Sequence, residues 1–216
     1  MKFYIYISKP KIDMLFSQLR NHSKSKLLRE IDINTKLVNL KQKSEYDTEN
    51  ITAKTRIVTE HIKASENMGT ILNPNNYIYD NLNMYITPLG YPSTNMLAVS
   101  GKKDDSVIIL GASKKHFIGN SSKSYDDNLT SVHFMLIFSE YLSTTKWNNS
   151  VSKRAKEKLY FGHKFFFHCV DFVRFQEEHR MPYQNLEFLA KTLTVGIDDE
   201  SGKKIVIATP VYIANN

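Results

Sequence analysis

The sequence predicts an α+β fold: a single domain over residues 1–216, with a mixed or mainly antiparallel sheet that contains a β-meander and is covered by two or more apolar helices. Three observations support this class. The chain opens with an alternating strand pattern, short apolar segments separated by turn residues follow between residues 70 and 118, and two long apolar helical patterns precede a last strand. A division near residue 125 is the alternative, although no linker rich in Pro, Gly or Ser marks it.

The first quarter of the chain predicts two strands and two helices. Lys2–Ser8 alternates aromatic and β-branched residues, which is typical of a strand. Residues 12–19 predict a short helix that leaves this strand. Lys36–Lys43 alternates loosely and predicts a second strand, and Ala53–Ala64 predicts a helix capped by Thr52.

The middle of the chain predicts the meander. Tyr77–Asp80 and Leu82–Thr87 have the composition of strands and could form one long or bulged strand. Met96–Val99 and Val107–Leu110 predict a hairpin, because Gly101–Asp105 between them has turn residues.

The last part predicts three helices and a final strand. Leu129–Leu142 is apolar almost all round and predicts a buried helix, and Arg154–His179 is the longest helical pattern. Asn185–Leu193 predicts a short helix with apolar residues at helical spacing. Ile205–Ile213 predicts a strand in which Pro210 marks an edge, a bulge or the end of pairing.

Composition limits the compartment and the partners. The one cysteine, Cys169, excludes an intrachain disulfide and a multi-cysteine zinc site. No apolar run reaches the roughly 20 residues of a membrane helix, and no signal-peptide pattern is seen, so we expect a cytoplasmic protein without a membrane partner. The net charge of +7 permits an anionic ligand. Nucleic acid is an unlikely partner, because no helix-turn-helix, zinc finger or RNA-binding aromatic motif is evident.

Two segments gather residues that could bind an anion. A strand ends at Gly111 and leads into a small, basic loop, and another strand ends before a loop with two lysines. Backbone N–H groups and lysines at strand ends can hold a phosphate. The candidate ligand-binding residues are Lys9, Lys11, Asp13, Gly111, Ser113, Lys114, Lys115 and His116. The alternative is that the lysines are only solvated and that Ser8 or Asp13 caps a helix.

The evidence for catalysis is weaker. A hydrolase could use Asp13 with His116 or His133, together with Ser113, but no Gly-x-Ser-x-Gly motif surrounds that serine. No His-Glu-x-x-His motif or carboxylate cluster indicates a metal, and no nucleotide-cofactor motif is present. Cys169 lies in an aromatic run, which favours burial over reactivity. We expect no cofactor or metal and favour a protein that is not an enzyme.

Four segments resemble a family of small uncharacterised bacterial proteins. They are FYIYISKPKIDML (Phe3–Leu15), SVIILGASKKHFIG (Ser106–Gly119), LEFLAKTL (Leu186–Leu193) and IVIATPVYIA (Ile205–Ala214). They are spread along the whole chain, so the resemblance implies a full-length match. Ala112 departs from the pattern, because family members are richer in glycine just before the serine-histidine loop.

The resemblance implies bacterial accessory gene content, in which defence roles are common, but no known activity. With the residues above, it leads to one main expectation: a cytoplasmic accessory protein that binds a small anionic, phosphate- or nucleotide-like ligand through strand-end loops. The alternatives are an interaction or assembly subunit, including a homo-oligomer, that regulates a partner effector, and a hydrolase with a His/Asp pair. These functions differ in what they require: a lysine-dependent pocket, an exposed apolar patch, or a His–carboxylate pair.

Overall fold

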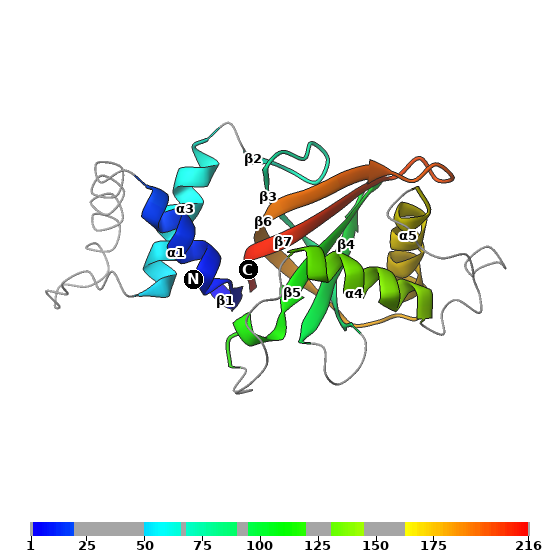
Figure 1. Ribbon diagram of the computed structural model, residues 1–216, viewed down its shortest axis with the longest axis horizontal. Helices are drawn as coiled ribbons and strands as arrows, with labels where there is room; N and C mark the ends of the chain where they lie inside the picture. Colours follow the sequence, from blue (N-terminus) through cyan, green and yellow to red (C-terminus); the bar gives the residue numbers. More distant parts are fainter. Residues whose placement is uncertain are drawn as a thin grey trace, which may run out of the picture.

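The computed structural model describes residues 2–19, 50–65, 68–89, 95–119, 131–144 and 163–215. The helices within these ranges are α1 (Lys9–Gln18), α3 (Ile51–Lys63), α4 (Ser131–Thr144), α5 (His163–Glu178) and the short 3-10 helix η1 (Lys114–His116). The strands are β1 (Phe3–Ile7), β2 (Met68–Gly69), β3 (Tyr77–Pro88), β4 (Met96–Lys103), β5 (Ser106–Ser113), β6 (Tyr183–Ile197) and β7 (Lys204–Asn215). In Figure 1, α1 and α3 lie together at one end of the molecule, while α4 and α5 lie against the strands.

Five strands close into a barrel. β3 pairs with β4, β4 with β5, β5 with β7, β7 with β6, and β6 returns to β3. The β5–β7 pair is parallel and the other four are antiparallel. We number the barrel strands by their order in the chain, from β3 as the first to β7 as the fifth. Around the barrel they then lie in the order first, second, third, fifth, fourth and back to the first, which is the connectivity of the OB-fold, a five-stranded Greek-key barrel.

The length of β3 explains how the barrel closes. Its residues from Tyr77 to Tyr85 pair with β6, and those from Met84 to Pro88 pair with β4. One twisted strand thus serves two neighbours. β2 adds a short parallel partner to the start of β3, and β1 adds an antiparallel partner to the end of β7. The fold is therefore a single α+β domain built on a mixed sheet, and barrel strands come from both sides of the possible division near residue 125, a position outside the described residues.

The predicted helix at Asn185–Leu193 is wrong, because these residues lie within β6. All five residues from Leu186 to Ala190 are buried. Alternate side chains of this stretch pack inside the barrel, whereas Leu189 packs on the opposite face with α1 and α3. A strand that is covered on both faces loses its alternation and can match a helical pattern. β6 closes the sheet into a barrel, because it pairs with both β3 and β7.

The barrel interior forms the first core. Its buried members come from every barrel strand and include Met84, Val99, Leu110, Phe188 and Val206. Their alternation along each strand is the pattern expected for a closed sheet. This core fixes which face of each strand points outward, and so determines which side chains remain for the helices and for a site.

α4 and α5 form a second core on the outer face of β4, β5 and β7. Gly111 allows α4 to approach, since a Cβ at this position would lie 2.2 Å from Cγ of Phe134. Under α5, the buried amide of Gln176 donates to Thr87 Oγ1 at 2.8 Å and accepts from Ser100 Oγ at 2.7 Å. Gln176 thus satisfies two hydroxyl groups that the helix covers.

α1 and α3 form a third core against β1, β6 and β7, with Ile12, Val58, Ile62 and Tyr212 among its buried members. The cap of α3 is Asn50, whose side chain accepts from the N–H groups of the second and third helical residues. The prediction that Thr52 caps this helix is therefore wrong by two positions. An asparagine is a strong N-cap because its short side chain reaches these N–H groups.

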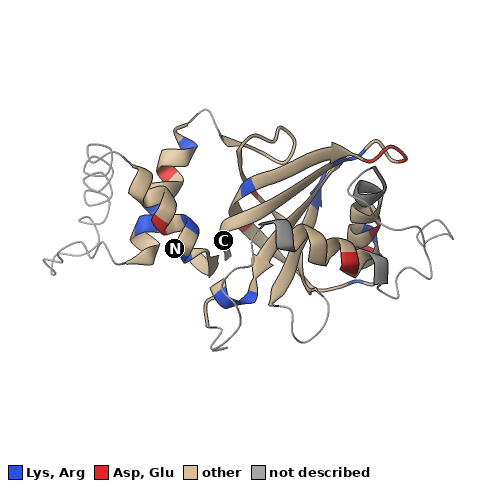
Figure 2. Ribbon diagram, in the orientation of Figure 1, with Lys and Arg blue, Asp and Glu red and all other residues tan. Residues whose placement is uncertain are grey.

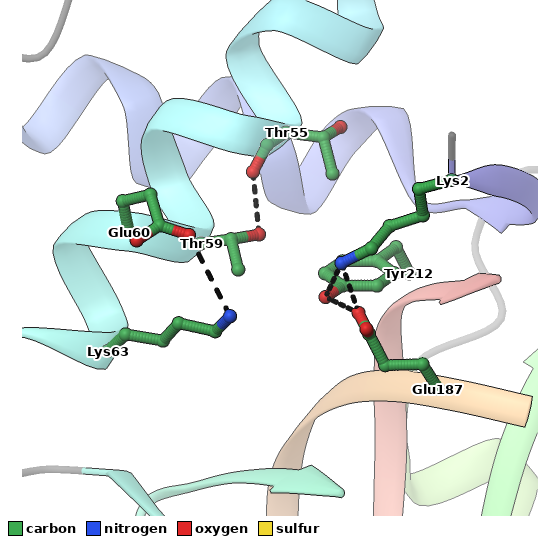
Figure 3. Close-up of polar contacts among 7 residues, drawn as sticks. All are labelled: Lys2, Thr55, Thr59, Glu60, Lys63, Glu187 and Tyr212. Carbon is green, nitrogen blue, oxygen red and sulfur yellow. Dashed lines mark hydrogen bonds and ion pairs between the residues drawn. The ribbon is translucent and has the colours of Figure 1, made fainter. Parts of the chain in front are cut away.

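A buried carboxylate ties the N-terminus to the barrel. Glu187 of β6 accepts from the Lys2 ammonium and, at 2.5 Å, from the Tyr212 hydroxyl (Figure 3). Burial acts to raise the pKa of Glu187, but hydrogen bonds from Lys2, Tyr212 and Tyr79 outweigh it and lower the pKa. The carboxylate is therefore stabilised in its charged form. In the same view α3 lies alongside, with Thr59 Oγ1 donating to the Thr55 carbonyl at 2.7 Å.

The remaining expectations divide into confirmed and undescribed ones. The first strand, the strands of the central hairpin, the helix now seen as α4, and the last strand are confirmed, and the two short segments after residue 76 form one strand. The expected burial of α4 holds for one face only, since Phe134, Phe138 and Leu142 are buried while Leu136 is 51% exposed. The predicted strand Lys36–Lys43 and the first half of the helix predicted at Arg154–His179 lie outside the described residues. In the part of the chain that the structure describes, no helix is both long enough and apolar enough to cross a membrane.

Candidate functional site

The face that OB-folds use for oligonucleotides is covered in this protein. OB-folds bind through the outer face of their second and third barrel strands, which correspond here to β4 and β5. That face is buried under α4 and α5, where Phe134 rests on Gly111 and Gln176 bonds to Ser100. OB-folds also bind ligands through the loops between their strands, so the ends of the strands are considered next.

A pocket of about 620 Å³ lies where the junction of β1 and α1 meets the segment after β5. Three parts of the chain, far apart in the sequence, form its walls. The lining residues are Ile7, Lys9, Pro10 and Asp13 from β1 and α1, Ile51 from the start of α3, and Lys115, His116, Phe117 and Ile118 from η1 and the residues after it.

Contacts between β1 and the segment after β5 hold the pocket walls together. Tyr6 forms an isolated β-bridge with Phe117, and the Ile118 N–H donates to the Ile5 carbonyl at 2.9 Å. The Tyr6 ring meets the rings of Phe117 and His116 edge to face, at centroid distances of 5.2 and 5.8 Å. Burial raises the pKa of the Tyr6 hydroxyl. Tyr6 is thus a neutral, buried support behind the cationic side of the pocket.

α1 supplies the opposite wall. The helix begins at Lys9, with Pro10 in its first turn, where a missing N–H costs nothing. Lys9 and Asp13 face the pocket together because residues four apart share one side of a helix. The first turn contains no acidic residue and Ser8 forms no side-chain cap. The positive end of the helix dipole is therefore not neutralised by its own first turn.

The pocket combines cationic and apolar groups. Lys9, Lys115 and His116 are its basic members, and its one acid, Asp13, pairs with Lys54 of α3 at 2.7 Å. Figure 2 shows Lys and Arg on α1 and on η1, the two elements that face each other across the pocket. Apolar side chains make up the rest of the lining. This arrangement suits an anionic group attached to an apolar or aromatic body.

The structure brings together four of the eight candidate residues: Lys9, Asp13, Lys115 and His116. The other four lie outside the lining. Gly111 lies within β5 beneath Phe134, so its lack of a side chain serves helix packing. Ser113 is the last residue of β5, and the N–H of Lys114 donates to the Asn95 carbonyl at 2.7 Å. The small-residue loop is thus the end of a strand followed by η1.

Lys11 points away from the pocket, toward β7. Its ammonium donates to Thr209 Oγ1 and, at 2.8 Å, to the Pro210 carbonyl. Burial, followed by the charge of Lys191, lowers the pKa of Lys11 to about 8. Pro210 lies at a bulge, because the register of β6 and β7 shifts between Leu189 and Ala190. This position agrees with the expectation for a proline inside a strand.

From the sequence we missed two residues that contribute to the site and lie outside the two predicted loops. Ile51 lines the pocket and Lys54 holds Asp13, and both come from α3. No local pattern marks either residue as part of a site, because each is an ordinary member of an amphipathic helix. Two apolar residues, Phe117 and Ile118, directly follow His116 in the sequence. They could have been included in the predicted site because of this position after the basic residues.

The described residues offer little for metal or thiol chemistry. Among them, no group of three or more His, Cys, Asp or Glu side chains is placed to hold a metal ion. Cys169 is buried in the second core, and burial raises the pKa of its thiol well above the usual value. Its predicted burial is confirmed. The side chain of His133, one candidate for a hydrolase, lies outside the described residues.

Comparisons with known proteins identify the chain at the level of a family. No curated protein and no solved structure matches it. A family model does match, over residues 2–216, and its description is a family of unknown function, DUF7019. The expectation of an uncharacterised family that matches along the whole chain is therefore confirmed. The chain belongs to the family of unknown function DUF7019.

Proposed function

We propose that this protein binds a small organic anion, phosphate- or nucleotide-like, in the pocket between α1 and η1. The observation that carries the proposal is the convergence of Lys9 with Lys115 and His116, which are more than 100 residues apart in the sequence. Lysine ammonium groups form charge-assisted hydrogen bonds with phosphate oxygens, each contributing about 1.5–3 kcal/mol. The first turn of α1 adds a favourable dipole.

The lining also supports a ligand larger than inorganic phosphate. Ile7, Pro10, Ile51 and Phe117 surround the basic groups with apolar surface. A volume of about 620 Å³ falls within the range of small-molecule sites, about 300–1,000 Å³. An aromatic or apolar body would bury this surface while its anionic group meets the lysines. Asp13 could accept a hydrogen bond from a hydroxyl or amino group of the same ligand.

The test begins with native mass spectrometry of the protein purified from its own host, followed by calorimetric titration with a panel of nucleotides and sugar phosphates. We expect one anionic ligand to bind, and the Lys9→Gln variant to weaken it by about tenfold or more, as expected for losing one charge-assisted contact. Lys203→Gln is the matched control, because it removes the same charge from the turn before β7, away from the pocket. Equal affinity for both variants, or no ligand at all, would refute the proposal.

Assembly with a second copy of the chain is the second candidate. Phe3 and Ile118 are 63% and 61% exposed. Both lie along β1, since the Ile118 N–H bonds to the Ile5 carbonyl. Exposed apolar side chains next to one strand are a common feature of association surfaces. Sedimentation of Phe3→Ser and Ile118→Ser against the native chain tests this candidate: an oligomer that depends on both residues, and is unaffected by Lys9→Gln, would favour it.

The hydrolase alternative stays a prediction without specific support. Asp13 and His116 both line the pocket, but the Asp13 carboxylate pairs with Lys54 rather than with a histidine. Ser113 is not among the lining residues. A phosphatase or esterase assay on native protein and on His116→Gln would detect such an activity.

A further inference from the structure

A gap between two neighbours of β7 sets the position of a partly buried ammonium group, that of Lys11. β5 pairs with β7 as far as Ala208, and β1 pairs with it from Tyr212 onward. Among the described strands, none pairs with the residues between on that side, and Pro210 has no N–H to offer. Their carbonyls turn instead to the β1–α1 junction: Pro210 accepts from Lys11 at 2.8 Å, and Val211 from the Ser8 N–H at 2.9 Å.

Lys11 does not use all of its donors in this gap. An ammonium group has three N–H donors, and within the described chain Lys11 bonds to Thr209 Oγ1 and to the Pro210 carbonyl. Thr209 in turn donates to the Gly111 carbonyl at 3.3 Å. One donor of Lys11 therefore has no acceptor among the described residues, and no carboxylate there balances its charge.

The charge that acts on Lys11 comes from a second cation. Lys191 of β6 is the direct cross-strand partner of Thr209, the residue that Lys11 contacts. Lys191 is exposed, and its ammonium group makes no hydrogen bond or ion pair with side chains or carbonyls of the described residues. Its charge adds to burial in lowering the pKa of Lys11. Two lysines thus converge on one threonine with no acid between them.

A purely structural role does not account for this pair. A neutral donor could satisfy the Pro210 carbonyl without placing a charge in a partly dehydrated site, and a second lysine on the adjacent strand only increases the repulsion. An anion would supply both missing features, an acceptor for the unused N–H and a countercharge for two ammonium groups.

We propose that Lys11, Lys191 and Thr209 form a second anion site, which binds the oxygen atoms of a phosphate or carboxylate group. The site lies on the other side of the first turn of α1 from the pocket, because residues 9 and 11 are about 200° apart around a helix. It does not depend on the ligand proposed for the pocket. Phosphate, with three or four oxygens, can meet both lysines at once, so we expect it to bind more tightly than acetate.

The test follows the Lys11 amine directly. Protein carrying 13C-labelled lysine is titrated with pH in chloride, in inorganic phosphate and in acetate, and the Lys11 side-chain resonance is assigned from its loss in Lys11→Met. Binding to the charged form raises the titration midpoint, and a rise of one pH unit in saturating phosphate corresponds to tenfold tighter binding of the protonated state. We expect at least this rise in the native chain.

Variants separate this site from the pocket. In Lys191→Gln, which alters an exposed residue and leaves the core unchanged, phosphate should raise the midpoint far less; in Lys9→Gln and Lys203→Gln the full rise should remain. An unchanged Lys11 titration in phosphate would overturn the proposal, and so would an equal rise in Lys191→Gln. If the Lys11 midpoint rises as expected but the protein binds no ligand in the pocket, the result supports the second anion site and refutes only the ligand proposed for the pocket.

Discussion

The pH dependence of unfolding is expected to show what it costs to bury Lys11. Burial, and then the charge of Lys191, lowers the pKa of this amine from 10.5 to about 8. Between these two values the unfolded chain binds more protons at Lys11 than the folded chain does, so the free energy of unfolding rises with pH. At 1.36 kcal/mol for each pH unit, the rise caused by Lys11 is about 3 kcal/mol between pH 8 and 10.5. Below pH 8 the cost is fully present.

Urea denaturation from pH 7 to pH 10, in chloride buffers, measures this effect as a difference between the native chain and Lys11→Met. The subtraction removes the contribution of other groups. Tyr4 is one of them, because burial raises its pKa from 10.0 to about 12 and its unfolded form begins to titrate near pH 10. The variant should gain about 2–3 kcal/mol less than the native chain over this interval, while Lys203→Met should behave like the native chain. If the Lys11→Met and native curves run parallel, Lys11 is not buried as an ammonium and the argument for the second anion site fails with it.

Three further predictions concern the cores. Gly111→Ala should destabilise the fold by about 1–3 kcal/mol through overpacking against Phe134, and a Phe134→Leu change in the same chain should restore part of this loss in urea denaturation. Glu187→Gln should lower the free energy of unfolding by about 1–2 kcal/mol near neutral pH. Because hydrogen bonds lower the pKa of Glu187, this difference from the native chain should shrink as pH falls through that pKa. Acid titration followed by circular dichroism measures the difference, and a difference that stays constant would contradict the idea. Gln176→Leu should lower the thermal midpoint, since it leaves two covered hydroxyl groups without their partner; removing both hydroxyls as well should recover stability.

The sequence predicts most elements because one face of each is exposed or its ends carry turn residues. It fails at β6, where Leu186, Leu189, Ala190 and Leu193 repeat at helical spacing although the chain is extended. The alternation that identifies a strand requires a polar face. Between Leu186 and Ala190 that face is covered by α1 and α3, so even Glu187 is buried. The sequence of one strand cannot show that distant helices will cover it, and barrel closure depends on this strand.

The candidate site shows which part of a site a local pattern can predict. Two strand ends followed by lysines could be identified, one of them with glycine, and the bridge between Tyr6 and Phe117 brings those ends together. The error lies in helical phase. With the helix expected to begin at residue 12, Lys9 and Lys11 belonged to one loop, but α1 begins at Lys9. On a helix Lys9 shares a face with Asp13 and opposes Lys11. A start three residues earlier therefore divides one expected cluster into two places, a pocket facing η1 and a partly buried ammonium facing β7, and the ligand proposed for each place needs a test of its own.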